Sequence, residues 1–414
     1  MKRQRIIYGL LVLFITIIGL WVIPELIKTA TYSKVQYPFG YYSSIEKKLM
    51  FRELDERKDK LHDDEGKVYE DKAFDLALPL LNYRQLTLNG EMPDSIDGVK
   101  IEPQQVRVKQ VFYRYSPKSK NMPQTGLYIM YESLPKKGKL ESPGDLFRLK
   151  DKIEFIDAES NTVNREKSRK FQDALLKAGY TFPAQWTAGD LNIRKPYDEG
   201  YFSLDARGQL FHIKMVNSRP FVRNTQLDPQ IEPAFFTMEE PSDKRFYGFL
   251  FDKRGNVYIL EEAGGKYHPR RLDIYPVNLD SDDLFLMGNF LYWTFTVQNS
   301  AGKHYYALKT ETLEKVRYAY VEAPTNKWDI IAGKLFPFYL TFRNSNSEYI
   351  APQLHFTTFI ALITNLLLAL VFALVYRDRT AKKKIFDSSY VLIFGIAGAI
   401  ALLLQWVIIE KNNQ

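Results

Sequence analysis

Three stretches of the chain are almost entirely apolar, and each is long enough to cross a membrane as a helix. They cover residues 6–23, 356–376 and 390–409, and none of them contains a charged side chain. A helix of about 18–21 residues rises ~27–31 Å, which matches the ~30 Å hydrocarbon core of a bilayer. The pattern therefore predicts one N-terminal and two C-terminal transmembrane helices.

The first of these stretches also fits a secretory signal peptide, because a basic tail precedes it. Its apolar run is longer than the apolar region of a usual signal peptide. Pro24, Glu25 and Lys28 follow the run, where a cleavage site would require small residues. We therefore expect an uncleaved anchor at residues 6–23.

The charge of the chain is concentrated beside the apolar stretches. The formal net charge is +8, and the basic residues expected to set the topology are Lys2, Arg3, Arg5, Arg377, Arg379, Lys382, Lys383 and Lys384. Short basic segments next to membrane helices stay in the cytoplasm. This places the tail and the loop at 377–389 inside and residues 24–355 outside, as in a bacterial inner-membrane protein facing the periplasm. The outer part is nearly neutral, so we expect no nucleic-acid partner.

Small residues line one face of each C-terminal span. In the second span they recur every four residues, and in the third they lie along the segment GIAGA; the positions are Ala361, Asn365, Ala369, Ala373, Gly395, Gly398 and Ala399. Such faces allow close helix packing, and an asparagine within a membrane seeks a hydrogen-bond partner. Either the two spans pack on each other as a hairpin, or one face docks a separate membrane subunit.

The segment between the first two spans changes character along its length. Residues 44–75 alternate in charge like a solvated helix, whereas aromatic and β-branched runs from about residue 101 favour strands. The prediction divides the chain into a cytoplasmic tail (1–5), a helix (6–23), an extracytoplasmic helical or linker region (24–100), a β-rich domain (101–350), a helix (356–376), a basic cytoplasmic loop (377–389) and a helix (390–409).

A repeat of 47 residues runs through the β-rich part. The segments FSLDARGQLFHI, FLFDKRGNVYIL and FTVQNSAGKHYYAL each read as strand, polar turn and strand, and the turn residues are Asp205 and Gly208, Asp252 and Gly255, and Asn299 and Gly302. Asp or Asn caps such a turn, and Gly supplies the positive φ that closes it. The period favours a β-propeller-like fold, with a sandwich or an irregular β domain as the alternatives.

Catalytic and metal-binding patterns are absent from the sequence. The chain has no cysteine, and its five histidines show neither H-E-x-x-H nor i, i+4 spacing. The run Gly264-Gly265-Lys266 lacks the first glycine and the Ser/Thr of a phosphate-binding loop. The segment LDSDD at 279–283 is a weak calcium candidate. We expect no cofactor and no enzymatic activity.

Three segments carry a family resemblance: LALPLLNYRQLTLNGEMPDSIDG, FIDAESNTVNREKSRKFQDALLKAGYTFPA and KPYDEGYFSLDARGQLFHIKMVNSRPFVRN. They resemble a family of uncharacterised bacterial envelope proteins that are typically encoded beside ABC-transporter ATPase and permease genes. The resemblance covers most of residues 70–350 and the terminal spans. It implies a non-ATPase accessory subunit whose partners are the lipid bilayer and an ABC permease with its ATPase. A stand-alone, membrane-tethered binding or sensing module is the alternative.

Overall fold

The computed structural model describes residues 2–33, 35–54, 58–123, 125–135, 139–195, 197–342, 349–375 and 380–411. The chain divides into two compact units. The β unit is Tyr37–Glu322, and the helical unit combines Met1–Gln36 with Ala323–Gln414.

Three antiparallel sheets form the body of the β unit, and each is a meander of strands that follow one another in the sequence. The 186–224 sheet contains β9 (Trp186–Gly189), β10 (Tyr201–Leu204), β11 (Leu210–Val216) and β12 (Arg219–Asn224). The 233–271 sheet contains β13 (Pro233–Met238), β14 (Gly248–Asp252), β15 (Val257–Ala263) and β16 (Lys266–Arg271). The 283–322 sheet contains β17 (Asp283–Gly288), β18 (Tyr292–Gln298), β19 (Gly302–Lys309) and β20 (Lys315–Glu322), and β6 (Val111–Tyr115) adds a fifth strand beside β17.

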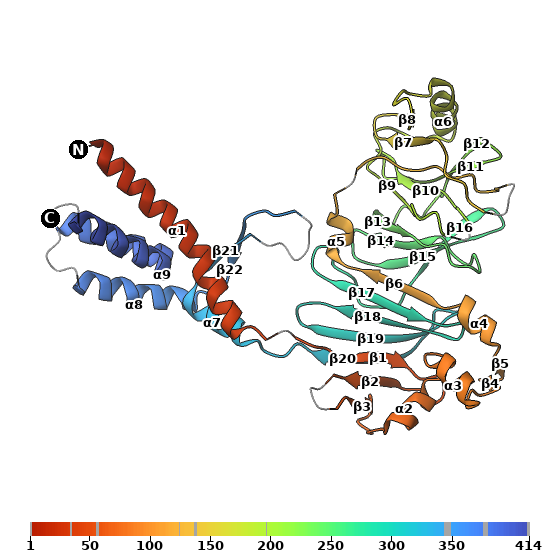
Figure 1. Cartoon of the computed structure of the whole chain (residues 1–414), viewed down its shortest axis with the longest axis horizontal. Helices are drawn as coiled ribbons and strands as arrows, with labels where there is room; N and C mark the ends of the chain where they lie inside the picture. Colours follow the sequence, from red (N-terminus) through yellow and green to blue (C-terminus); the bar gives the residue numbers. More distant parts are fainter. Residues whose placement is uncertain are drawn as a thin grey trace. The chain divides into compact units, whose positions relative to one another are not determined.

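Smaller elements lie at the two ends of this series. The 145–157 hairpin is β7 (Asp145–Leu149) and β8 (Ile153–Asp157), followed by α6 (Arg165–Lys177). The 39–63 sheet is β1 (Phe39–Tyr42), β2 (Leu49–Glu53) and β3 (Lys60–Asp63). The connection to β6 contains α2 (Asp71–Ala77), α3 (Tyr83–Asn89), β4 (Ser95–Ile96), β5 (Val99–Lys100) and α4 (Pro103–Val108), and α5 (Pro117–Asn121) follows β6. Figure 1 shows the 145–157 hairpin, the three large sheets and the 39–63 sheet following one another as a stack.

Apolar side chains fill the spaces between neighbouring sheets. One cluster joins the hairpin to the 186–224 sheet, a second joins that sheet to the 233–271 sheet, and a third joins the latter to the 283–322 sheet. Strands β10 and β14 are buried along their whole length, because a sheet covers each of their faces. Aromatic rings dominate these layers, for example Phe249 stacked on Tyr113 at 4.1 Å. The hydrophobic gain of this burial holds the stack together.

The β unit is mainly β, but the described residues do not form a closed ring of sheets. The 39–63 sheet packs on the 283–322 sheet through Tyr42, Phe51 and Tyr305. Within the described ranges, no hydrophobic cluster joins the 39–63 sheet to the 145–157 hairpin at the other end. The series of sheets is therefore open where a closed propeller would join its first and last blades.

The charge pattern at 44–75 suggested a helix, and the structure corrects this. The regular elements described in this stretch are the strands β2 and β3 and the start of the short helix α2, and no helix runs through it in the described residues. The reason lies in Leu49, Met50 and Phe51, which are all buried. Leu49 and Phe51 pack against Tyr305 of the 283–322 sheet, and Met50 packs against Phe74 of α2 on the other face. This burial outweighs what the flanking charges would gain from helical pairs.

Two of the three predicted turns have the expected geometry. The Asp205 Oδ1 atom accepts hydrogen bonds from the Arg207 and Gln209 amides at 2.9 and 2.8 Å, and Asp252 caps its turn in the same way. Gly208 and Gly255 have φ of 78° and 82°. The left-handed backbone at both glycines closes a three-residue turn after the capped aspartate.

The third turn differs, and the expected role of Gly302 is wrong. Asn299 and Gly302 close a shorter turn directly, with the Asn299 amide donating to the Gly302 carbonyl at 2.9 Å. Gly302 is the first residue of β19 and is not among the glycines with positive φ. A side chain there would overlap the Val321 carbonyl oxygen. Glycine is therefore needed for close approach of β20 rather than for backbone freedom.

The helical unit is built from three long helices and a small outer layer. The helices are α1 (Lys2–Thr31), α8 (Ile360–Val375) and α9 (Ala381–Lys411), and α9 is interrupted at Gly395, whose φ is 57°. The outer layer consists of α7 (Lys327–Leu335), β21 (Phe338–Thr341) and β22 (Gln353–Phe356). Trp328 and Phe336 pack there against Ile23 and Ile27 of α1.

The observed bounds correct the predicted ones at the C-terminus. In the described part of the chain, two helical segments are long and apolar enough to cross a membrane, Ile6–Thr31 and Ala381–Val407. Helix α8 is shorter, with 16 residues, because β22 takes up the residues before it. The predicted loop at 377–389 is helical from Ala381 onward, so Lys382, Lys383 and Lys384 lie in the first turns of α9. Arg377 and Arg379 lie outside the described residues.

Candidate functional site

The repeat turns lie next to one another in the β unit, and a cleft opens between each neighbouring pair. The first cleft lies between the Asp205 turn and the Asp252 turn, and the second lies between the Asp252 turn and the Asn299 turn. Successive turns of the 47-residue repeat therefore border successive clefts. These clefts are the candidate binding sites of the β unit.

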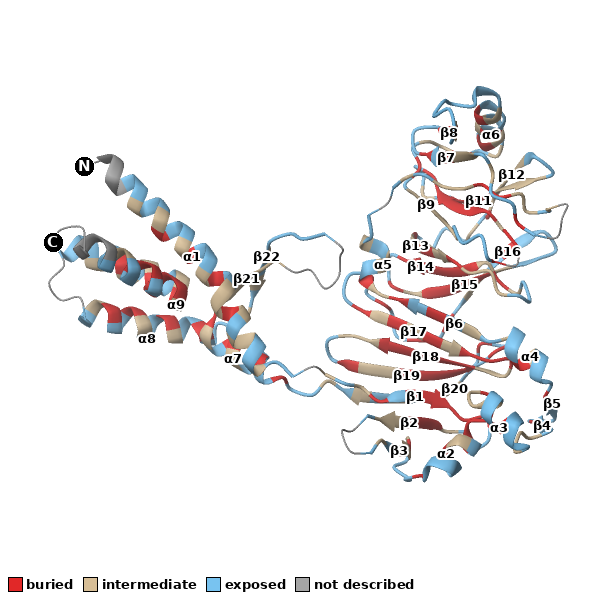
Figure 2. Cartoon of the chain, viewed as in Figure 1, coloured by how far each residue is buried: buried red, intermediate tan, exposed pale blue. Residues whose placement is uncertain are grey.

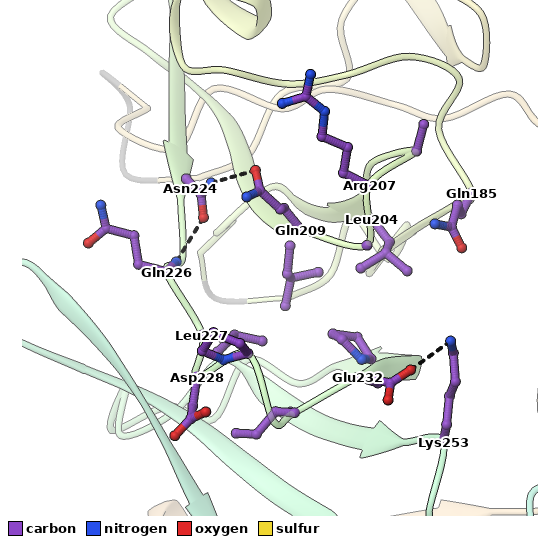
Figure 3. A pocket seen from close by; sticks show the side chains of 16 residues that line it. Gln185, Leu204, Arg207, Gln209, Asn224, Gln226, Leu227, Asp228, Glu232 and Lys253 are labelled. Carbon is purple, nitrogen blue, oxygen red and sulfur yellow. Dashed lines mark hydrogen bonds and ion pairs between the residues drawn. The ribbon is translucent and has the colours of Figure 1, made fainter.

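The first cleft has a volume of about 710 Å³ and is shown in Figure 3. Its polar wall combines four side-chain amides with two basic and two acidic side chains, and leucine, isoleucine and proline form its apolar wall. The polar lining residues are Gln185, Gln209, Asn224, Gln226, Arg207, Lys253, Asp228 and Glu232. The Asn224 amide donates to the Gln209 side-chain oxygen at 3.2 Å, and Lys253 pairs with Glu232 at 2.9 Å. Amides present donors and acceptors without net charge, so this cleft suits a neutral polar ligand.

The second cleft has a volume of about 850 Å³. It includes the 279–283 segment that the sequence offered as a weak calcium candidate. Asp282 is buried and caps its own loop, accepting from the Asn278 amide at 2.9 Å and the Ser281 hydroxyl at 2.7 Å. Asp280 forms an ion pair with Lys120 at 2.7 Å. Both carboxylates therefore have protein partners, and the described residues contain no group of three or more His, Asp or Glu side chains suited to a metal ion.

A buried ionic cluster lies between the 186–224 and 233–271 sheets, and the sequence gave no sign of it. The Lys195 Nζ atom lies 2.5 Å from an Asp198 carboxylate oxygen and 2.7 Å from a Glu240 carboxylate oxygen. All three side chains are at most 3% exposed. Burial raises the pKa of Asp198, and it raises the pKa of Glu240 to about 7. Neighbouring Glu239 also has its pKa raised to about 7 by burial.

This cluster ties the loop before β10 to the loop after β13. The Glu199 amide also donates to the Glu240 carboxylate at 2.5 Å. None of the clefts described above includes Lys195, Asp198 or Glu240, and no ligand could reach groups so deeply buried. The cluster therefore fixes one sheet against the next, with desolvation opposing the ion pairs.

His212 is the one buried histidine among the described residues, and it is structural. Its ring stacks on Phe202 at 4.5 Å. Nε2 donates to the Glu199 carbonyl at 2.5 Å and Nδ1 accepts from the Tyr267 hydroxyl at 2.7 Å. Burial lowers its pKa to about 3, so the imidazole stays neutral and its two nitrogens are satisfied. A neutral imidazole that is buried and hydrogen bonded at both nitrogens acts as a packing residue of β11.

The small-residue faces of α8 and α9 meet inside the helical unit. Ala361, Asn365 and Ala369 are buried, whereas Ala373 is half-buried. The Asn365 amide donates to the Leu392 carbonyl of α9 at 3.1 Å. Gly395, Gly398 and Ala399 of α9 are buried as well. Helix α9 of the same chain therefore covers the small-residue face of α8. The sequence had left open that a separate membrane subunit covers this face.

A second close contact joins α9 to α1. A Cβ atom at Gly19 would lie 3.0 Å from the Ala397 Cβ, and the Thr16 and Tyr390 hydroxyls are hydrogen bonded at 2.8 Å. Small residues on α9 thus admit a helix on each side. Thr16 and Asn365 are buried inside this bundle, and large apolar side chains lie on its outer surface. Figure 2 shows the exposed positions along α1 and α8. Leu10, Phe14, Leu367 and Leu370 are each more than half exposed.

Comparisons with known structures give only distant likenesses. The WD40 domain of SCAP from fission yeast aligns at 12% identity over 79% of this chain and 74% of that chain, with a TM-score of 0.28. Hydrazine synthase from Kuenenia stuttgartiensis aligns at 9% identity over 55% of this chain and 53% of its own, with a TM-score of 0.25. For the dihydro-heme d1 dehydrogenase NirN the identity is 11%, the coverage is 62% and 66%, and the TM-score is 0.23. These values establish neither fold nor function.

Sequence comparison is more informative. No curated protein matches the chain. A family model described as "Domain of unknown function (DUF4857)" matches residues 39–308, which is more than half of the chain and most of the β unit. The chain therefore belongs to the DUF4857 family.

Proposed function

We propose that this protein is a membrane-anchored binding subunit, with α1, α8 and α9 in the bilayer and the β unit outside the cytoplasm. One observation carries the proposal: most of the leucine, isoleucine and phenylalanine side chains described in α1, α8 and α9 are exposed, whereas Thr16 and Asn365 are buried. Such a surface is stable in lipid and would aggregate in water. The Asn365 side-chain NH2 group and the Thr16 and Tyr390 hydroxyls form hydrogen bonds within the bundle, which a lipid environment favours.

The orientation follows from the basic residues near the helix ends. With the N-terminal tail and the start of α9 in the cytoplasm, the β unit of a bacterial inner-membrane protein faces the periplasm. Reporter fusions test this orientation directly. A fusion at residue 380 should report a cytoplasmic position and one at residue 250 a periplasmic position. The reverse pattern would overturn the charge argument.

We further propose that the β unit is an open, propeller-like array. Its 47-residue repeat and its sheets of consecutive antiparallel strands support this assignment. Blades of this kind present their turns and the clefts between them along a common rim, where propellers bind ligands. The two clefts beside the repeat turns are the corresponding places in this chain.

The wider role we propose is that of a non-ATPase accessory subunit of an ABC-type transport system. The resemblance described above is the main support for this role. Three helices are too few to enclose a transport path, and the predicted spans contain no ionisable side chain, so a second, multi-span protein has to supply the path. Since α9 already covers the small-residue face of α8, such a permease would contact the outward apolar faces of α1 and α8.

Affinity purification from native membranes tests this role. The full-length chain should co-purify with a multi-span permease and an ATPase. A matched pair of variants locates the contact: Leu367→Trp changes the outward face of α8, whereas Leu88→Trp changes an exposed position of the β unit. The first should weaken recovery of the permease and the second should not. Repeated recovery of the chain alone would favour the stand-alone binding or sensing module, which would keep its function on an unrelated membrane anchor.

A further inference from the structure

A group of rings lies at the mouth of the second cleft. This ring platform consists of Tyr275, His304, Tyr306, Tyr318 and Tyr320. His304 and Tyr320 are directly opposite each other on β19 and β20, and Tyr306 and Tyr318 form the next pair along the same strands. Residues two apart on a strand point to the same face, so the four rings share one side of the sheet. Tyr275, from the segment after β16, covers the His304 ring at 4.6 Å with an interplanar angle of 14°.

Hydrogen bonds hold the platform rigid. The Tyr320 hydroxyl donates to the Ala301 carbonyl at 2.7 Å, the Tyr306 hydroxyl accepts from the Tyr275 amide at 3.1 Å, and the Tyr318 hydroxyl is hydrogen bonded to His304 Nδ1 at 3.0 Å. These hydroxyl groups already have partners within the protein, and Tyr275, Tyr318 and Tyr320 keep part of each ring accessible to solvent. A surface ordered in advance loses little entropy when a ligand binds to it.

The exposure of these rings sets them apart from their surroundings. Tyr275, Tyr318 and Tyr320 are 45, 48 and 42% exposed. Among the described residues between Ile193 and Ile330, they are the only large apolar side chains that are exposed. Aliphatic side chains and methionine, which accompany aromatic rings at the centre of protein interfaces, are therefore missing from the patch. A protein partner would find no apolar contact there beyond the rings.

Charge around the platform excludes a strongly ionic ligand. Lys315 pairs with Asp273 at 2.7 Å, and Lys120 pairs with Asp280 at 2.7 Å. Burial lowers the pKa of His304, so the imidazole is neutral near pH 7. The platform therefore offers flat apolar faces without net charge. The adjoining cleft offers hydroxyl and amide groups, and its charged lining residues balance in sign: Lys120, Lys253 and Arg254 against Asp252, Asp280 and Asp282.

We propose that the ring platform and the second cleft together bind a neutral oligosaccharide. A pyranose ring has flat C–H faces that pack on aromatic faces and hydroxyl groups around its edge that need hydrogen bonds, which matches a stacking surface beside a polar groove. Tyr275 belongs to both parts, since it also lines the cleft of about 850 Å³. One sugar unit stacks on Tyr275 and Tyr320, and further units extend past the Asn299 turn into the cleft. This inference names the ligand class for the binding subunit proposed above.

The test uses the full-length chain in a detergent that contains no sugar, because a glycoside detergent would compete. Hexasaccharides of glucose, N-acetylglucosamine, mannose and xylose are titrated calorimetrically against the wild type and three variants. Tyr275→Ala removes a stacking face and should weaken binding of the preferred hexasaccharide by about tenfold. Tyr275→Phe keeps the ring and should bind within about twofold of the wild type. Phe112→Ala, on β6 and 64% exposed, controls for loss of an exposed ring elsewhere.

Two outcomes would overturn the inference. One is that no hexasaccharide binds the wild type, and the other is that Tyr275→Ala binds as tightly as the wild type. Loss of a co-purifying protein in Tyr275→Ala without any saccharide binding would make the patch a protein interface instead. Recovery of a permease and an ATPase with the wild type is scored separately, so a failure of the saccharide site is distinguishable from a failure of the proposed transport role.

Discussion

The two units of this chain differ most in the side chains that they expose. The β unit places aromatic rings such as Phe249 and Trp293 inside, and, apart from a few buried groups such as the Lys195 cluster, its charged residues lie outside. The helical unit places Thr16 and Asn365 inside and exposes leucine and isoleucine. In the membrane-anchored arrangement that we propose, water surrounds the first unit and lipid the second, and each surface is stable only in its own solvent. The contrast shows that burial pattern, more than composition, identifies the environment of a domain.

The largest expected effect comes from opening the core of the β unit. Phe249→Ala removes a fully buried ring that stacks on Tyr113 of β6 and should destabilise the unit by about 3–5 kcal/mol. Urea denaturation followed by intrinsic fluorescence measures the change. Leu88→Ala, at a position that is 85% exposed, should stay within about 0.5 kcal/mol of the wild type. Equal effects of the two substitutions would contradict the assignment of this core.

A charged substitution at an exposed position should have a different effect on membrane integration in each of the two units. Leu370→Arg on α8 and Leu191→Arg in the β unit alter positions that are 54 and 49% exposed. In lipid, an arginine at the helix centre costs about 2.5–3.5 kcal/mol of insertion free energy, whereas in water the change is nearly neutral. The membrane-integrated fraction of each variant, measured after carbonate extraction, should fall for Leu370→Arg alone. If both variants integrate fully, the helical unit is not embedded in lipid.

The repeat turns offer a finer comparison within the β unit. Gly208 has open space around it, so Gly208→Val strains only the backbone and should cost about 1–3 kcal/mol. Gly255→Val adds a clash, because its Cβ would lie 2.6 Å from the Val277 carbonyl oxygen, and should be the more destabilising of the two. At Gly302, φ is not positive, so Gly302→Val should destabilise the unit only through the clash with β20. The order of the three melting temperatures checks these reasons, and identical melting of all three with the wild type would mean that the turns are not structural.

The smallest expected effect is a dependence on pH. Burial raises the pKa of Glu239 to about 7, so between about pH 4.5 and 7 the folded β unit keeps a proton that the unfolded chain releases. Its stability should therefore fall as the pH rises through this window. In Glu239→Gln the thermal unfolding of the β unit should depend less on pH than in the wild type. A wild-type melting temperature that rises from pH 5 to pH 7.5 would show that Glu239 is not the controlling group.

The sequence predicted those features of the fold that depend on neighbours in the chain. Long apolar runs mark α1 and α9 because hydropathy is a local property, and Asp205 and Asp252 mark their turns because the cap is made within five residues. The length of α8 escaped prediction, since Phe356 pairs with Phe338 in a hairpin. Leu49 and Phe51 were assigned to a helix because their burial depends on Tyr305, far away in the sequence.

The candidate site could be predicted only in part, for the same reason. The repeat located the turns that border both clefts, but the ring platform forms only when β19 pairs with β20 and Tyr275 folds over His304. Lys195 and Glu240 come from different sheets, so no spacing in the sequence indicates their ion pair. Gly302 shows why a matching motif does not guarantee a matching role. It aligns with Gly208, but its turn is one residue shorter, so Gly302 allows close approach of β20 instead of supplying a positive φ.

The pairing of β6 with β17 has a consequence for how the protein is made. Tyr115 lies opposite Leu284. Strand β6 is therefore synthesised long before β17, the strand with which it pairs. Contacts between distant parts of a chain close slowly, and an unpaired strand edge invites aggregation meanwhile. The β unit should therefore acquire its final cooperativity only after the 283–322 sheet is complete, so a truncated product ending before residue 283 would leave β6 exposed to chaperones and proteases.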